Sequence, residues 1–258
     1  MGLLLLIGIL GILCGFLSGL LGIGGGIIMA PLLLYVPPLF GYETLAMRTV
    51  AGLTIIQGLV ACIAGVIAHN RFNFVSGRLA SWMGITIFSA SLIGGAAANY
   101  VDNRILLFIF GGLAITASIL MFIPKKQDHE APDINTLEFN RWRAVTTSGS
   151  VGLLGGLVGQ GGSFILIPLM TSYVHIPTRI AVGSNLAIVL LSTAAAFTGK
   201  ALTGQIEWLM AVPIILTVIP AASLGGAISH KVPVLALRRI LAVLIGLAAA
   251  RVWISLLF

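Results

Sequence analysis

The chain has 258 residues, of which 59% are hydrophobic and only 8% are charged, and its formal net charge is +7. Soluble domains carry about 25% charged residues, so this composition excludes a soluble globular protein. Several apolar runs exceed the roughly 18 residues that mark a membrane-spanning helix and lack the alternation of a β-barrel, so the sequence predicts an all-α, polytopic transmembrane bundle. The basic residues lie in short loops, where they set orientation in the bilayer rather than bind nucleic acid.

In chain order, the first predicted element is a pair of apolar helices over about 2–40, broken by the glycines of "GIGGG" at 22–26. Three plain spans follow at about 49–68, 79–98 and 104–123. The second half has the same order, with a broken pair over about 144–174 and spans at about 180–199, 208–228 and 235–257. We therefore expect a first transmembrane repeat (1–123), a polar cytoplasmic linker (124–143) and a second transmembrane repeat (144–258).

The two halves are an internal duplication. The stretch "GLLGIGGGIIMAPLLL" from Gly19 is closely similar to "GGLVGQGGSFILIPLM" from Gly155. Further on, Arg48 matches Arg179, and "GGA" at Gly94 matches "GGA" at Gly225.

The distribution of positive charge predicts how each broken pair crosses the membrane. If both pairs are hairpins, one face receives ten basic residues and the other receives four, whereas single spans would divide them almost evenly. Hairpins place both termini outside and invert the second repeat relative to the first. Inverted repeats are typical of secondary transporters, whose substrate site lies near the membrane midplane. The two sets are Arg71, Arg78, Lys125, Lys126, Arg141, Arg143, Arg179, Lys231, Arg238 and Arg239 on one face, and Arg48, Arg104, Lys200 and Arg251 on the other.

The glycines have two predicted uses. Gly15 with Gly19, and Gly152 with Gly156, have the spacing that lets helix backbones pack closely. The denser clusters would break the helices, and the helices that restart at about Ile27 and Phe164 would offer free N–H groups to an anion. The alternative is that these glycines only form tight turns at the membrane surface. The predicted tip residues are Gly24, Gly25, Gly26, Gly161, Gly162 and Ser163.

Polar residues near the start of the next span complete the predicted site. Thr54, Ser184 and Asn185 either cap that span or face a cavity, where Gln57 would join them one turn further on. Arg48 and Arg179 either pair with an oxyanion or extend to the membrane interface. They would lie on opposite faces, which suits two gates better than one shared site.

These motifs resemble those of the sulfite exporter TauE/SafE family. The resemblance rests on the doubled glycine stretch, on "VAGLT" at Val50 and "AVGSN" at Ala181, and on "GQIEW" at Gly204. It implies a multi-pass permease of the bacterial plasma (inner) membrane for small anions such as sulfite or sulfoacetate. The chain departs from the family pattern in having Leu53 and Thr54, and Ser184 and Asn185, after the glycine where Thr and Ser are usual. A histidine of the family pattern is present as His69, but Lys200 stands near the matching place in the second half.

We therefore expect a secondary transporter that exports a small anion (sulfite, sulfoacetate or a related organosulfonate) by alternating access in the lipid bilayer. An uptake permease or a channel for thiosulfate or another small anion is the alternative. A membrane-embedded enzyme is a third possibility, but no convergent set of His, Cys, Asp or Glu supports one. We expect no cofactor, no metal and no nucleic-acid partner, and a coupling proton, if there is one, would travel with the substrate or through histidine.

Overall fold

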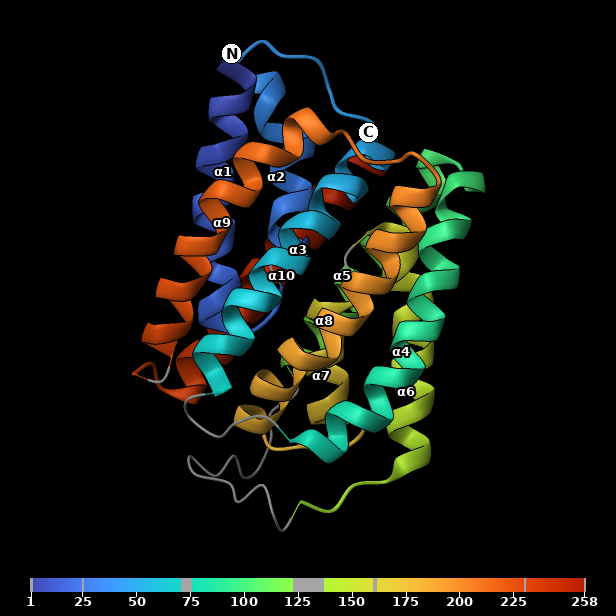
Figure 1. Ribbon diagram of the computed structural model, residues 1–258, viewed down its shortest axis with the longest axis vertical. Helices are drawn as coiled ribbons and strands as arrows, with labels where there is room; N and C mark the ends of the chain where they lie inside the picture. The colour runs from blue at the N-terminus through green and yellow to red at the C-terminus, as the bar shows by residue number, and fades with distance from the viewer. Residues whose placement is uncertain are drawn as a thin grey trace.

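The computed structural model describes residues 2–24, 26–70, 76–122, 137–159, 162–229 and 231–257. Within these residues the protein is all-helical and each half contains a broken helix pair followed by three long helices, as predicted (Figure 1). The first half consists of α1 (Gly2–Leu21), α2 (Gly26–Leu39), α3 (Met47–Asn70), α4 (Gly77–Ala97), a short 3₁₀ helix η1 (Ala98–Tyr100) and α5 (Asn103–Phe122). The second consists of α6 (Arg141–Val158), α7 (Ser163–Ser172), α8 (Thr178–Leu202), α9 (Trp208–Ser229) and α10 (Val234–Leu257).

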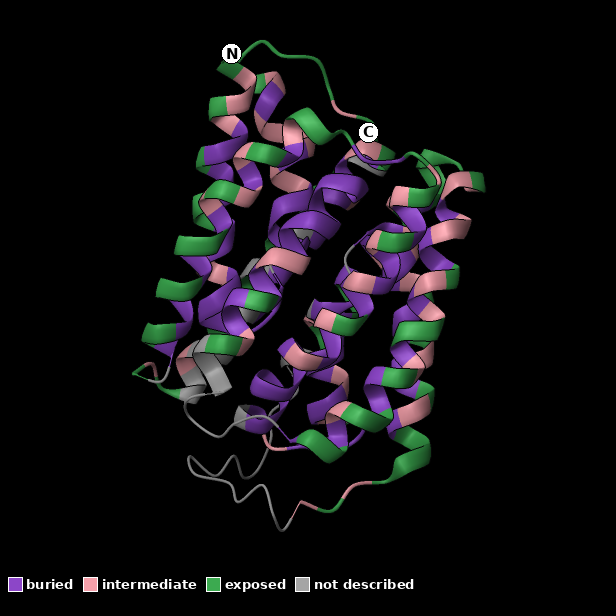
Figure 2. Cartoon of the chain, in the orientation of Figure 1, coloured by how far each residue is buried: buried purple, intermediate pink, exposed green. Residues whose placement is uncertain are grey.

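Among the described helices, six are long and apolar enough to cross a membrane: α1, α3, α4, α5, α8 and α9. Large apolar side chains point outward from the bundle, and Leu5, Ile85 and Leu216 are each about two-thirds exposed or more. Figure 2 shows this pattern, with exposed residues on the outer helices and mostly buried residues along α3 and α8. Because exposed leucine and isoleucine at this density would be costly in water, the outer surface is one that faces lipid.

Both broken pairs are hairpins. α1 starts at the end of the bundle that holds both termini, and α2 returns to that end (Figure 1). α6 starts at the opposite end and α7 returns to it. Each first helix ends at a glycine in the left-handed region, Gly22 with φ 68° and Gly159 with φ 75°, a conformation that glycine adopts at little cost. The two hairpins therefore enter the bundle from opposite ends.

The first helix of each hairpin packs on a helix of the other half. α1 of the first half packs on α9 of the second, and α6 of the second packs on α4 of the first. The paired glycines of α1 and α6 meet the "GGA" glycines at these two contacts: a Cβ on Gly19 would overlap the carbonyl oxygen of Ala222, and one on Gly156 would lie 2.6 Å from the carbonyl oxygen of Ser91. The predicted close approach of helix backbones is thus confirmed, and it joins one half to the other.

The basic residues follow the hairpin topology. Arg78, Arg141, Arg143 and Lys231 lie in or just before the first turns of helices that begin at the linker end of the bundle, and Arg239 lies in the second turn of such a helix. Arg48, Arg104 and Lys200 belong to helix ends at the side of the two termini, and Arg251 lies in the half of α10 that is nearer to this side. Most of the linker falls outside the described residues, and its cytoplasmic position and the domain boundaries stay predictions.

Cysteine labelling tests this orientation. The positive-inside rule places the linker end in the cytoplasm, so in a Cys14→Ala, Cys62→Ala background we expect Glu138→Cys to react with a membrane-impermeant maleimide only in opened cells. Glu43→Cys, which is exposed at the other end, should react in intact cells. The reverse pattern would contradict the orientation.

Candidate functional site

The tips of the two hairpins meet inside the bundle. A Cβ placed on Gly24 would lie 3.3 Å from both the Cβ and the Oγ of Ser163, and 3.4 Å from the Sγ of Cys62. Gly24 belongs to the break between α1 and α2, and Ser163 is the first residue of α7. The break in each membrane hairpin therefore lies against the other and is buried in protein, which is the condition for tolerating irregular backbone at membrane depth.

Each break is held by the third helix of the opposite half. Asn185 of α8 donates through Nδ2 to the carbonyl oxygen of Gly22 at 2.6 Å. Thr54 of α3 donates through Oγ1 to the carbonyl oxygen of Gly159 at 3.0 Å. Thr54 and Asn185 occupy equivalent positions in the two repeats, as do Gly22 and Gly159. The same hydrogen bond between a hairpin tip and the other half, which we call the brace, therefore occurs twice, once in each direction.

Several polar atoms near the tips have no partner among the described residues. Both amide atoms of Gln57 and the hydroxyl of Ser163 are unpaired, as is the side-chain oxygen of Asn185. All three side chains are 0% exposed. An unpaired buried polar group costs about 1–3 kcal/mol, so this site is a place where a ligand would supply the missing bonds.

Gln57 lies at the level of the tips. A Cβ on its neighbour Gly58 would lie 3.5 Å from the carbonyl oxygen of Gly24. The Gln57 amide offers two N–H donors and the Ser163 hydroxyl offers one O–H donor. The first turn of a helix adds N–H groups that have no intrahelical partner and a partial positive charge, and both α2 and α7 begin at the tips. The arrangement is rich in donors and contains no formal charge, which suits a small anion with several oxygen acceptors.

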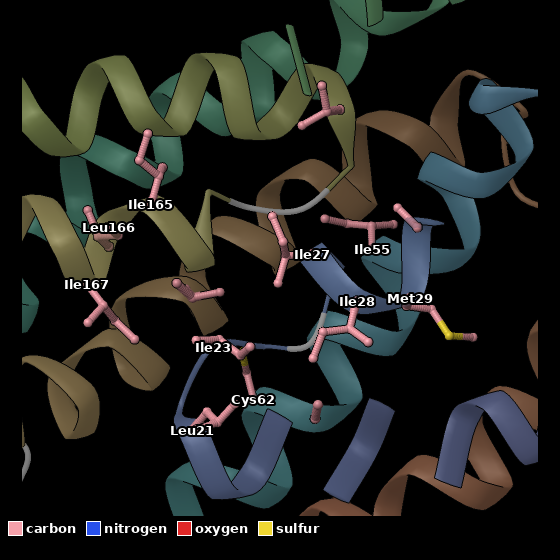
Figure 3. Close-up of a cluster of buried hydrophobic side chains, with 14 of the residues drawn as sticks. Leu21, Ile23, Ile27, Ile28, Met29, Ile55, Cys62, Ile165, Leu166 and Ile167 are labelled. Carbon is pink, nitrogen blue, oxygen red and sulfur yellow. The ribbon is translucent and has the colours of Figure 1, made fainter. Parts of the chain in front are cut away.

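Apolar side chains surround this donor group. Ile23, Ile27 and Ile55 are fully buried, and Figure 3 shows them with Cys62 around the break of the first hairpin and Ile165 on the second. Cys62 and Cys14 are free and buried, as expected for small apolar residues. Hydrogen bonds to an anion are stronger in such a water-poor setting than at an exposed surface.

The other predicted site residues are placed as follows. Gly26 is the buried first residue of α2, and Gly162 precedes α7 with φ 73°, whereas Gly25 and Gly161 fall outside the described residues. The Ser184 hydroxyl accepts a hydrogen bond from the backbone N–H of Ser76 at 2.9 Å. Its partner is thus at the start of α4 rather than at the tips.

Thr54, Ser184 and Asn185 do not lie at helix starts, in contrast to the expectation from sequence. α3 begins at Met47 and α8 at Thr178, so these residues are about two turns inside their helices. Their side chains consequently do not cap these helices. Each bonds the backbone of another segment instead, and Thr54 also bonds the carbonyl oxygen of Ala51 in its own helix.

The two arginines lie at opposite ends of the bundle. Arg48 is exposed in the first turn of α3, where its guanidinium donates to the carbonyl oxygen of Asn99 at 3.1 Å. Arg179 belongs to the first turn of α8 at the linker end, and its side chain is not described. The structure thus separates both from the tips.

Sequence reasoning passed over Gln205 and gave Lys200 little weight. The Nζ of Lys200 donates to the Oε1 of Gln205 at 3.2 Å, and Lys200 is 0% exposed. The available signal was the repeat itself, which aligns Lys200 with His69. Within the part of the chain that the structure describes, no group of three His, Cys, Asp or Glu residues could hold a metal ion.

Comparison with known proteins identifies the family. The chain is 23% identical over 257 residues to the probable membrane transporter protein YunE of Bacillus subtilis (strain 168), covering 92% of this chain and 94% of that protein. It is 25% identical over 253 residues to a probable membrane transporter protein of Methanocaldococcus jannaschii, covering 92% and 91% of the two chains. A probable membrane transporter protein of Xylella fastidiosa (strain Temecula1) is 26% identical over 219 residues, with 85% and 82% covered. No solved structure matches the chain.

The sequence profile described as Sulfite exporter TauE/SafE matches residues 7–252, which is nearly the whole chain. Together with the apolar helices and the transporter relatives, this match shows that the chain is a transmembrane protein belonging to the TauE/SafE family of membrane transporters.

Proposed function

We propose that this protein is a secondary transporter that exports a small oxyanion, sulfite or a short organosulfonate such as sulfoacetate, across the bacterial plasma membrane by alternating access. The observation that carries the proposal is the group of unpaired, fully buried donors on Gln57 and Ser163 beside the touching hairpin tips. An oxyanion has enough acceptor oxygens to bond both side chains and the first-turn N–H groups at once.

The crossed brace supports alternating access. Each hairpin tip is bonded to the third helix of the other half, through Asn185 to Gly22 and through Thr54 to Gly159. A movement of one half against the other would therefore displace both tips at the same time. The tips are in contact here, so the anion would enter as they part, from one end or the other. Two hairpins that run in opposite directions are the arrangement that inverted repeats produce around a midplane site.

The acidic residues restrict any proton coupling. None of the seven Asp and Glu residues lies inside a helix that the structure describes. A chain of carboxylates through the bundle is therefore not available for proton transfer. If transport is coupled to protons, we propose that the proton travels on the anion itself or through histidine.

Substitution of the two donors tests the proposed site. A hydrogen bond to a charged partner contributes about 1.5–3 kcal/mol, so we expect Gln57→Leu and Ser163→Ala each to reduce counterflow of labelled sulfite in proteoliposomes by roughly 10- to 100-fold. The fold should be preserved, since neither side chain bonds any described residue.

Ser89→Ala is the matched control, because this exposed serine bonds only the carbonyl oxygen of Ile85 in its own helix. Wild-type counterflow in both Gln57→Leu and Ser163→Ala would contradict the tip site. Counterflow also separates a carrier from a channel, since only a carrier exchanges bound solute without net current. Competition by sulfite, sulfoacetate, thiosulfate and acetate would identify the preferred anion.

A further inference from the structure

Lys200 is a fully buried cation whose bonding is incomplete. It lies in the last turn of α8, at the end of the bundle opposite the linker, and is 0% exposed. Its ammonium group carries three N–H donors, and the described residues supply one side-chain acceptor, the Oε1 of Gln205 at 3.2 Å. A buried charge normally has both a counter-charge and a full set of hydrogen bonds. The described residues therefore leave two of its three N–H donors without an acceptor.

Gln205 is fixed so that its oxygen faces Lys200. Its Nε2 donates to the hydroxyl of Thr203 and to the carbonyl oxygen of Gly95 at 3.5 Å. The backbone of Gln205 also packs closely on α3, where a Cβ on Gly52 would overlap its carbonyl oxygen. The amide is thus held by α4 and by its own loop, and its backbone is packed against α3. Its oxygen is a neutral acceptor and does not balance the charge of Lys200.

A second cation lies beside this group. Arg48 is close enough to act electrostatically on Lys200, and its guanidinium bonds Asn99, one turn beyond Gly95 at the same end of α4. Lys200, which is buried, and Arg48, which is exposed, therefore form a local excess of positive charge. The acidic residues at this end, Glu43, Asp102 and Glu207, are exposed, and none forms a salt bridge with Lys200 or Arg48 among the described residues.

The C-terminal end of α8 accounts for only part of this arrangement. A cation near a helix C-terminus gains only a modest stabilisation from the helix dipole. Removing an ammonium group from water costs more than the dipole returns, and the dipole supplies no acceptor for the two remaining N–H groups. The carbonyl oxygen of Lys200 is itself used by the N–H of Gln205 at 3.0 Å.

We propose that Lys200, oriented by Gln205, forms a second anion site, distinct from the hairpin tips, with Arg48 on its exposed side. The ligand is a small oxyanion such as sulfite or sulfate, held by the two unused N–H donors of Lys200 and attracted by Arg48. That this site holds the anion before it is transported rests on the proposed function. That the site binds a small oxyanion does not. In the alignment of the two repeats, His69 is the equivalent of Lys200 and Arg179 is the equivalent of Arg48. Both of these equivalents belong to helix ends at the linker end of the bundle.

Anion-dependent thermal unfolding of the purified full chain tests the site. The background is Gln57→Leu with Ser163→Ala, which disables the tip site, and the probe is sodium sulfite compared with sodium chloride at equal ionic strength. We expect this background to retain a sulfite-dependent rise in melting temperature. Lys200→Met should weaken the apparent sulfite affinity by roughly 10-fold or more, the factor that one charge-assisted hydrogen bond contributes.

Gln205→Glu is the sharper variant, because it keeps the shape of the side chain and gives Lys200 an internal carboxylate. We expect it to remove the response to sulfite, because the carboxylate would occupy the ammonium group in place of the anion. If Lys200 serves only the end of α8, the response to sulfite should persist in Gln205→Glu. Arg104→Gln, an exposed arginine at the same end, is the control and should respond like the background.

A sulfite response that survives Gln205→Glu, or a background with no response, would overturn the second site. If counterflow fails for every anion while the response still depends on Gln205, the transport proposal falls and the second site stands. If Lys200→Met does not fold, Gln205→Glu alone decides.

Discussion

Leucine at Gly162 is expected to abolish transport and to leave membrane insertion intact. Gly162 precedes α7 with φ 73°, a conformation that costs other residues about 1–2 kcal/mol. A Cβ there would overlap the Cγ1 of Val151 and lie 2.8 Å from its carbonyl oxygen. The next residue is Ser163, whose hydroxyl is one of the proposed donors. The tip would have to move, and the donors would no longer converge.

Counterflow measured together with the amount of folded protein in the membrane checks this result. Gly41→Leu is the matched control, because Gly41 has φ 79° but lies in the loop after α2 with open space around it. It carries the same backbone strain without a clash at the tip. Wild-type flux in Gly162→Leu, or equal loss in Gly41→Leu, would contradict a specific role for the tip.

The hairpins and long helices could be predicted because the signals are local. Apolar length fixes the spans, and four glycines within five residues near Gly24 rule out a continuous helix. The helices that follow the breaks begin at Gly26 and Ser163, each within one residue of the predicted start. Because the sequence is duplicated, each of these signals occurs once in each half.

The partners of the polar residues could not be predicted, because they are distant in sequence. Thr54 bonds a carbonyl 105 positions away and Asn185 bonds one 163 positions away. Sequence alone shows a hydroxyl or amide near the predicted start of a span, where capping is a local and plausible use. Which carbonyl it meets depends on how the two halves pack.

Burial was equally hard to infer for Lys200. Its position near a predicted helix end is compatible with a side chain that extends to lipid headgroups. It is buried because the ends of α4 and α3 and the Gln205 loop cover the end of α8. The charge pattern of the sequence does not predict that these segments cover Lys200.

Leucine at Gly19 is expected to prevent stable folding, which is a larger effect than loss of transport. A Cβ on Gly19 would overlap the carbonyl oxygen of Ala222 and lie 2.8 Å from the backbone nitrogen of Gly226. Overpacking against a side chain costs about 1–3 kcal/mol. Here the obstacle is the backbone of α9, which cannot rotate away, so the whole helix must shift. We expect aggregation or a broad profile in size-exclusion chromatography after detergent extraction.

Gly112→Leu is the matched control, since Gly112 lies inside α5 with nothing within 4 Å of an added Cβ. It should elute and melt like the wild type, and a Gly19→Leu variant that did the same would contradict the contact. Gly156→Leu extends the argument, because Gly156 makes the equivalent contact between α6 and α4. If the two crossed contacts hold one hairpin each, loss of either should release a tip from its brace. Both variants are therefore expected to fail in the same way, although they lie in different halves of the chain.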